Sequence, residues 1–238
     1  MGGGTRPKRA GSVWERPEPP RPAPLSRDRI VGAALEIADA DGLEAVSLRK
    51  VGAALGAGPM RLYGYVESKE ELLDLMVDTV YGEMVAAGAI GGPWKEALRT
   101  LAARLRAAAG AHPWFLGLLG GRPHQGPHAL ELLEQALAAL RASPGFGEID
   151  AVLQAVRTVH AYVVGALWSE ALELRAGQSE SEWQAAQWPY LQRVLATGRF
   201  PTLAEVVERA THPSSEEAFG RGLEMVIAGI EGGLARAR

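Results

Sequence analysis

Apolar residues near the beginning of the chain recur at the spacing of an amphipathic helix. Ile30, Ala33 and Ile37 fall three or four positions apart and therefore share one face. Ser26 precedes this pattern, where its hydroxyl can accept a hydrogen bond from a free backbone N–H group. Gly42 follows it, and glycine suits the left-handed conformation that often ends a helix. The pattern predicts a first helix between these two residues.

Two short helices and one longer helix are predicted next. Ser47 can cap a short second helix, and Gly56 interrupts it. A third short helix is expected over residues 58–65. Ser68 and Glu71 then have the spacing of a capping box, which opens a longer fourth helix. Two short helices joined by a tight turn with glycine have the geometry of a helix-turn-helix.

Helical spacing continues through the rest of the chain, without the strict alternation of a strand. Further helices are predicted over residues 94–109, 113–119, 127–141, 148–175, 180–196, 203–208 and 215–235. We therefore expect an all-α fold, with an N-terminal three-helix domain over residues 25–70 and a larger helical domain over residues 71–238. Residues 1–24, rich in glycine, proline and arginine, are predicted to be a disordered basic tail.

Composition narrows the class of protein without changing this fold. The chain has 238 residues, of which 47% are hydrophobic, so there is enough apolar material for a core. It contains no cysteine, which excludes disulfides and thiolate metal sites. No apolar run reaches the roughly 18 residues that a membrane span needs. We expect a soluble, cytoplasmic protein that does not enter a membrane.

The basic residues are unevenly distributed along the chain. The formal net charge is −3, yet residues 47–66 contain Arg49, Lys50 and Arg61 and no acidic side chain. A basic front on an acidic body suits local contact with the phosphates of DNA.

The third predicted helix sorts its side chains onto two faces. Leu62 and Val66 continue the apolar face, and the remaining side chains point outward, as in a recognition helix that reads DNA. The outward residues are Pro59, Met60, Arg61, Tyr63 and Tyr65. An arginine can bond guanine bidentately, whereas proline and methionine can make only apolar contacts with bases.

This segment and its flanks closely resemble the TetR family of bacterial repressors. The similarity is carried by residues 29–35, Leu55-Gly56, Leu62-Tyr63, Tyr65-Val66 and residues 68–73. The resemblance implies that Lys69 and the two tyrosines, Tyr63 and Tyr65, contact the DNA backbone. It also implies that Arg49 reaches a base or a phosphate. Gly64 stands where the family usually has a larger residue, so we expect one DNA contact fewer.

A weaker resemblance, to the ligand-binding domain of tetracycline repressors, continues in the second domain. It is carried by residues 112–114, 121–123 and 219–223. It implies a buried small-molecule site and a homodimer through the eighth and last helices, predicted at 148–175 and 215–235. The segments that line the family's pocket carry Trp114, Leu118, Tyr162, Val163, Leu167 and Trp168. This set suits a small hydrophobic effector; the alternative is that these residues only form core.

Each of the two helices assigned to the dimer carries an apolar stripe at helical spacing. The stripes are Val152, Val156, Val159 and Val163 on the first helix, and Phe219, Leu223, Val226, Ile227 and Ile230 on the second. A single domain could bury both stripes, but the resemblance places them in the seam between two copies.

The metal–drug site of tetracycline repressors is not expected here. Leu118 and Ser169 stand where that branch has a histidine and an acidic residue. His124 and His128 are four positions apart, but no third metal ligand is evident near them. We expect no metal and no other cofactor.

Three functions follow from these observations. The first is a transcriptional repressor that binds a palindromic operator in double-stranded DNA and is released by a small hydrophobic effector. The second is a DNA-binding regulator, such as an activator, that has no effector. The third is an all-helical enzyme, for which we find no nucleophile–base pair, phosphate loop or paired-carboxylate motif.

Overall fold

The computed structural model describes residues 24–121, 123–175, 180–211 and 213–236, so all but the last residue of the predicted tail lies outside it. Within these ranges the chain is helical and contains no strand, which confirms the all-α prediction. The elements are α1 (Arg27–Asp41), η2 (Leu43–Ala45), α2 (Leu48–Ala54), α3 (Pro59–Leu62), α4 (Lys69–Ala86), α5 (Trp94–Ala111), η3 (Phe115–Leu118), α6 (Pro127–Arg141), α7 (Ile149–Arg175), α8 (Glu180–Leu195), α9 (Pro201–Arg209) and α10 (Ser215–Arg236).

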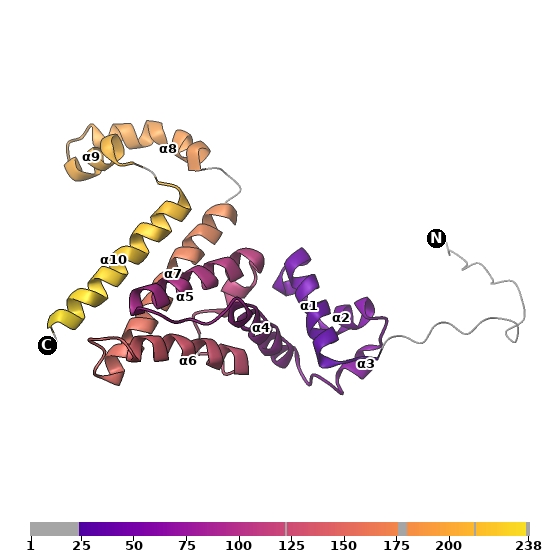
Figure 1. Cartoon of the computed structure of the whole chain (residues 1–238). Helices are drawn as coiled ribbons and strands as arrows, with labels where there is room; N and C mark the ends of the chain where they lie inside the picture. The colour runs from indigo at the N-terminus through magenta and orange to yellow at the C-terminus, as the bar shows by residue number, and fades with distance from the viewer. Residues whose placement is uncertain (1–23, 122, 176–179, 212, 237–238) are drawn as a thin grey trace, which may run out of the picture.

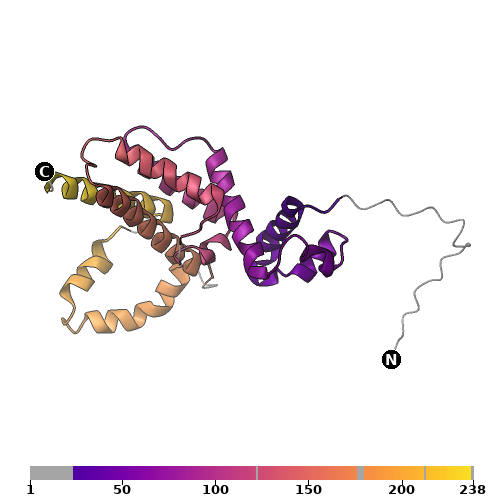
Figure 2. The same cartoon turned by 90° about the horizontal axis from the view of Figure 1, so that it is seen from below.

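The helices form a small group and a large group, joined by α4. Figures 1 and 2 show α1, α2 and α3 together at one end of the molecule; we call these three helices the head. The helices α5, α6, α7 and α10 form a larger group, which we call the body. Helix α4 packs against α1 of the head and against α6 of the body, and the buried apolar side chains form one connected cluster through both groups.

The head is held by a small apolar core and by capped helices. Ile30 of α1, Val51 of α2 and Leu62 of α3 are completely buried against one another's helices. The predicted caps are confirmed: the side chains of Ser26, Ser47 and Ser68 accept hydrogen bonds from backbone N–H groups in the first turns of α1, α2 and α4. The local sequence therefore fixes where each helix of this unit begins.

The body is organised around α7, which packs on α5, α6 and α10. The two apolar stripes predicted for a dimer seam lie largely in this packing. All four valines of the first stripe are buried, as are Phe219, Leu223 and Ile227 of the second. Helix α5 supplies a partner for both stripes within one chain, which is the alternative that the sequence left open. The apolar side chains that α7 and α10 leave exposed do not belong to the two stripes; they include Leu153 on α7 and Met225 on α10.

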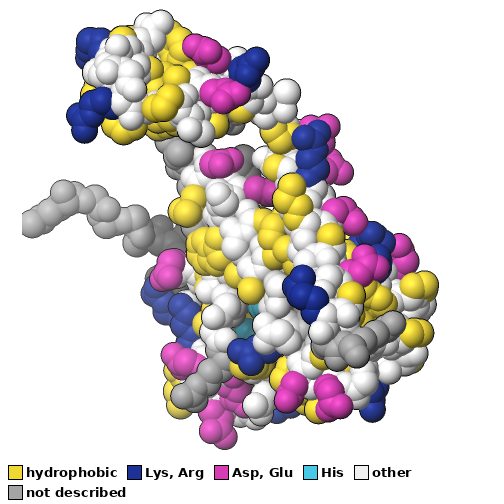
Figure 3. Space-filling view, turned by 90° about the vertical axis from the view of Figure 1, so that its left-hand side faces the viewer, with side chains coloured by type: hydrophobic (Ala, Val, Ile, Leu, Met, Phe, Trp, Pro, Cys, Tyr) yellow, Lys and Arg dark blue, Asp and Glu magenta, His cyan; other side chains and the backbone are white. Residues whose placement is uncertain are grey.

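Helices α8 and α9 project from the body as an arm. In Figures 1 and 3 the arm stands clear of the other helices, between the end of α7 and the beginning of α10. The two helices pack on each other. Large apolar side chains remain exposed on them: Trp183, Trp188, Tyr190, Leu203 and Val206.

Two predicted helices are shorter than expected. The third helix ends at Leu62, although the N–H groups of Tyr65 and Val66 both still donate to the Leu62 carbonyl and continue the helical turn. The helix predicted over residues 113–119 is reduced to the 3₁₀ segment η3. Glycine lowers helix propensity, and Gly117 and Gly120 fall within or next to this segment, Gly120 with a φ of +92°.

Candidate DNA-binding surface and ligand pocket

The turn between α2 and α3 depends on two glycines. The N–H group of Ala57 donates to the carbonyl of Gly52 over 2.8 Å and folds the chain back after α2. A Cβ atom at Gly52 would lie 2.8 Å from the carbonyl oxygen of Ala57, so any side chain there would force the backbone apart. Gly56 has a φ of +63°, which other residues rarely adopt. These two glycines set the angle between the two short helices.

Five side chains form an outward surface on and just after α3. Met60 is 81% exposed, Tyr63 48% and Tyr65 38%, and Pro59 and Arg61 are exposed as well. A cluster of exposed large apolar and aromatic groups is one mark of a candidate interaction surface. On the opposite face Leu62 and Val66 are completely buried. The structure thus leaves all five predicted residues exposed and buries the two apolar residues between and after them.

Two further basic residues predicted to contact DNA lie at helix beginnings. Arg49 is exposed in the first turn of α2, and Lys69 is the half-buried first residue of α4, directly after the cap Ser68. The first turn of a helix offers free N–H groups and a positive dipole end, which favour an anion such as phosphate. Arg27 adds a positive charge near this surface, since its Nε donates to the Tyr65 carbonyl over 3.4 Å.

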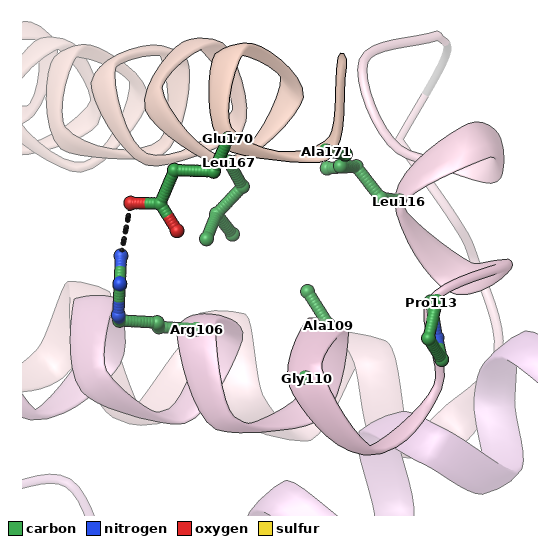
Figure 4. A pocket seen from close by; sticks show the side chains of 8 residues that line it. All are labelled: Arg106, Ala109, Gly110, Pro113, Leu116, Leu167, Glu170 and Ala171. Carbon is green, nitrogen blue, oxygen red and sulfur yellow. Dashed lines mark hydrogen bonds and ion pairs between the residues drawn. The ribbon is translucent and has the colours of Figure 1, made fainter. Parts of the chain in front are cut away.

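A pocket of about 380 Å³ lies in the body between α5, η3 and α7 (Figure 4). Its lining is mostly small or apolar: Ala109, Gly110, Pro113, Leu116, Leu167 and Ala171. One ion pair crosses its rim, where a guanidinium nitrogen of Arg106 lies 2.7 Å from a carboxylate oxygen of Glu170. The small side chains leave room that a larger set would fill. The pair provides a single polar anchor in an otherwise apolar site.

A second cavity, of about 600 Å³, lies between α5 and α10 and shares Arg106 with the first. It is also lined by Arg99, Phe219 and Leu223. The Arg106 guanidinium lies 4.5 Å from the centre of the Phe219 ring, a cation–π contact. Arg106 therefore lies between the two spaces and is held by Glu170 on one side and by Phe219 on the other.

Only Leu167 of the six residues predicted to bind the effector lines the first pocket. Val163 is completely buried in the body core, Leu118 is half-buried at the end of η3, and Trp168 is half-buried on α7. Trp114 donates its indole N–H to Asp39 of α1 over 2.6 Å. Tyr162 donates to the Phe219 carbonyl over 2.7 Å and so joins α7 to α10. Burial raises the pKa of the Tyr162 hydroxyl, and the negative charge of the nearby Glu170 carboxylate raises it further.

The pocket residues that the sequence did not indicate come from α5 and from the C-terminal part of α7. Arg106 and Glu170 are 64 positions apart, and charged residues on helices are usually solvated. The available signal was the run of small residues at 107–111 on α5, which marks a helix face that larger side chains do not fill.

The histidines singled out by the sequence form hydrogen bonds within the protein. His124 donates through Nε2 to the Leu118 carbonyl over 3.0 Å. His128 lies with Nδ1 2.9 Å from Oδ2 of Asp78, and the same carboxylate accepts the N–H groups of His128 and Ala129 at the beginning of α6. Among the described residues no group of three or more histidine, aspartate or glutamate side chains is placed to hold a metal ion. None of the helices described is long and apolar enough to cross a membrane.

Comparison with known proteins agrees with this architecture. Residues 89–234 match the family model of the tetracycline-repressor-like C-terminal domain. The transcriptional repressor DrrR1 of Streptomyces coeruleorubidus is 38% identical over 95% of this chain and 86% of its own. The structure of ActR from Streptomyces coelicolor without ligand superposes with a TM-score of 0.78 and 29% identity, over 91% of this chain and 99% of that one.

A second ActR structure, in complex with actinorhodin, superposes with a TM-score of 0.77 and 30% identity, over 91% of this chain and all of ActR. The similarity therefore spans the head, the body and the arm. The chain, with its helix-turn-helix head and helical body, belongs to the TetR family of transcriptional regulators.

Proposed function

We propose that this protein is a transcriptional repressor whose head binds a palindromic operator and whose body releases it on binding a small molecule. The observation that carries the DNA-binding role is the exposed surface of Met60, Arg61, Tyr63 and Tyr65 beside a turn set by glycines. Its side chains are too large and apolar to be left in water without a partner, and its charge suits DNA.

Within this surface the residues have different tasks. Arg61 is free to reach a base edge, where a bidentate contact with guanine gives sequence discrimination. Lys69, Arg49 and the two tyrosines, Tyr63 and Tyr65, contact the backbone and fix the position of the head. Pro59 and Met60 pack on apolar base atoms such as a thymine methyl group. The head and the body act as separate domains, with the boundary near residue 70 at the beginning of α4.

The pocket between α5, η3 and α7 is the proposed effector site. Its apolar lining supports a hydrophobic ligand, and Arg106 supports one that also carries an anionic or hydrogen-bond-accepting group. ActR, which shares this fold, is found in complex with actinorhodin. We take actinorhodin as the first probe for this chain.

The protein acts as a homodimer through α7 and α10, which lets two heads meet two half-sites of a palindrome. The stripes that are buried within the chain are not free for this purpose. The exposed or half-exposed faces of the same helices are, and they include Leu153, Val164 and Trp168 on α7 and Met225 on α10. A Leu153→Glu, Met225→Glu variant is expected to elute as a monomer in size-exclusion chromatography, whereas the unchanged chain elutes as a dimer.

A regulator without an effector and a helical enzyme are the competing functions. The pocket favours an effector over none, since a mostly apolar space of about 380 Å³ with one ion pair at its rim has the lining of a small-molecule site. Against an enzyme stands the sequence, which offers no nucleophile–base pair, phosphate loop or paired-carboxylate motif.

Selection of bound sites from random duplex DNA tests the proposal. The protein is expected to enrich a palindrome with half-sites about 34–36 Å apart, one helical turn, or a multiple of that. Actinorhodin is expected to lower the affinity for the enriched duplex. Enrichment of no sequence would refute the repressor, and enrichment with no ligand effect would favour the regulator without an effector.

A further inference from the structure

The head and the body are joined by a polar contact outside the proposed DNA surface and pocket. Oδ1 of Asp39, near the C-terminal end of α1, lies 2.8 Å from Nδ1 of His112 and accepts the indole N–H of Trp114 over 2.6 Å. Nε2 of His112 lies 3.1 Å from a carboxylate oxygen of Glu83 on α4. One carboxylate of the head is thus held by two side chains of the body.

Protonation strengthens this contact. Burial lowers the pKa of His112, but its hydrogen bonds to Asp39 and Glu83, with the attraction of both carboxylates, outweigh burial and leave the pKa raised. With a carboxylate at each ring nitrogen, the imidazolium can donate to both. The charged groups that face His112 are therefore Asp39 from α1 and Glu83 from α4.

The chain segment that makes this contact also forms a wall of the pocket. Gly110, Pro113 and Leu116, spaced by three, line the pocket. His112 and Trp114, which flank Pro113, are bonded to the head instead. Figure 4 shows Pro113 and Leu116 at the edge of the cavity, on the chain that leads from α5 into η3. A molecule that presses on Pro113 therefore acts on the chain directly between the two residues that hold Asp39.

Movement of Asp39 reaches the DNA surface through α1. This helix packs along α2, and α2 in turn holds α3 by the glycine turn. Packed helices move as rigid units because their interiors are dense. A shift at the C-terminal end of α1 therefore changes the direction in which the head presents its outward surface.

We propose that Asp39 is the coupling residue of this repressor: through His112 and Trp114 it sets the orientation of the head, and ligand in the adjacent pocket changes that orientation. The inference rests on the proposed function for the ligand effect. It differs from a purely structural role for the contact, in which its loss would lower stability and leave the ligand effect on DNA intact.

Two variants each weaken the contact with little change in shape. Trp114→Phe deletes the indole N–H and keeps an aromatic ring in the core. Asp39→Asn removes the negative charge. The matched control is Asp41→Asn, which lies on the same helix and removes an ion pair with Lys50 inside the head. Each variant is compared with the unchanged chain for actinorhodin affinity without DNA, and for DNA affinity with and without actinorhodin.

The unchanged chain is expected to bind its selected duplex about 10-fold or more weakly with actinorhodin than without, within the usual range of allosteric coupling. In Trp114→Phe and Asp39→Asn this ratio is expected to fall at least three-fold, while actinorhodin affinity stays within two-fold. Asp41→Asn is expected to keep the ratio. An unchanged ratio in both contact variants would overturn the proposal.

A distance measurement tests the orientation without any ligand. The chain has no cysteine, so spin labels at Glu36→Cys on α1 and Ala138→Cys on α6, with labelled protomers diluted in an excess of unlabelled chain, report the head-to-body distance within one protomer. The distribution is expected to be narrow in the otherwise unchanged chain and Asp41→Asn, and broader or shifted in Asp39→Asn. Identical distributions would overturn the proposal. If no palindrome is selected, the proposed repressor function is refuted. The measured distances still decide whether Asp39 orients the head.

Discussion

The head and the pocket of this protein place their functional residues in opposite ways. The head takes its proposed DNA-facing residues from one short stretch, 49–69, and the most exposed large apolar one, Met60, has 81% of its surface in solvent. The pocket takes its residues from α5, η3 and α7, and its two charged groups, Arg106 and Glu170, are bonded to each other. The head is therefore ready to meet its partner, whereas a ligand in the pocket must compete with a contact already made. A repressor that binds DNA without ligand needs this difference.

The largest effect is expected from a substitution that disrupts the turn between α2 and α3. Gly52→Val places a branched side chain against the Ala57 carbonyl, which is backbone and cannot turn aside. Overpacking of this kind costs about 1–3 kcal/mol of unfolding free energy. The variant is expected to lose operator binding entirely in a mobility-shift assay, with a lower melting temperature.

The matched control is Gly32→Ala on α1, where a Cβ atom would meet nothing within 4 Å. Removing a helical glycine there is expected to stabilise the fold by about 0.4–1 kcal/mol. Normal operator binding by Gly52→Val would contradict the role given to the turn.

Arg61→Ala tests whether the exposed head reads sequence. Loss of a bidentate contact with guanine is expected to cost about 1–3 kcal/mol at one position of each half-site. In a repeated selection, that position should become degenerate while the others stay fixed. A selected site that keeps all of its positions would show that Arg61 reads no base.

Arg106→Gln tests whether the pocket binds the ligand through its guanidinium. The change removes the guanidinium that we expect to receive the polar group of the ligand, and a lost charge-assisted hydrogen bond costs about 1.5–3 kcal/mol. Actinorhodin affinity measured by calorimetry should fall about ten-fold or more, by the same principle. DNA affinity without ligand should not change.

Arg209→Gln is the control for the pocket variant, because Arg209 is exposed on the arm, where it pairs with Glu205. It is expected to bind both actinorhodin and DNA as the unchanged chain does. Equal losses in the two variants would mean that general charge, and not the pocket, attracts the ligand.

Lys69→Ala is expected to weaken all duplexes together, because a phosphate contact carries no sequence information. The slope of the logarithm of the binding constant against the logarithm of the salt concentration should become shallower by about one unit, as expected for one lost phosphate contact. Titrations at several salt concentrations measure it. A change confined to one base position would place Lys69 at a base edge instead.

The smallest effect concerns the joint between the two regions and depends on pH. Because the pKa of His112 is raised above 6.5 in the folded chain, its protonated contacts stabilise the fold at low pH. This stabilisation is fully present below 6.5 and is lost as pH rises through the folded value. The unfolding free energy of the unchanged chain should therefore approach that of His112→Gln as pH increases above 6.5. A difference in unfolding free energy between the two chains that stays constant from pH 5.5 to 8.5 would contradict this role of His112.

The same comparison explains what could be predicted from the sequence. In the head, Ser47, Gly56 and Leu62 act within a few residues of where they stand, so spacing alone placed the turn and both of its faces. In the body, Tyr162 looked like a pocket residue but bonds to a carbonyl 57 positions away. Its neighbour in space could not be known from helical spacing. The stripes of α7 and α10 were predicted to lie in a dimer seam, but α5 covers most of their residues within the chain. Helical spacing does not reveal that contact either.

Hydrogen–deuterium exchange with and without the selected duplex tests the central claim most directly. We predict new protection within residues 47–69 on adding the duplex, and its loss when actinorhodin is added. Protection confined to the body or the arm, with residues 47–69 exchanging as in the free protein, would contradict the account.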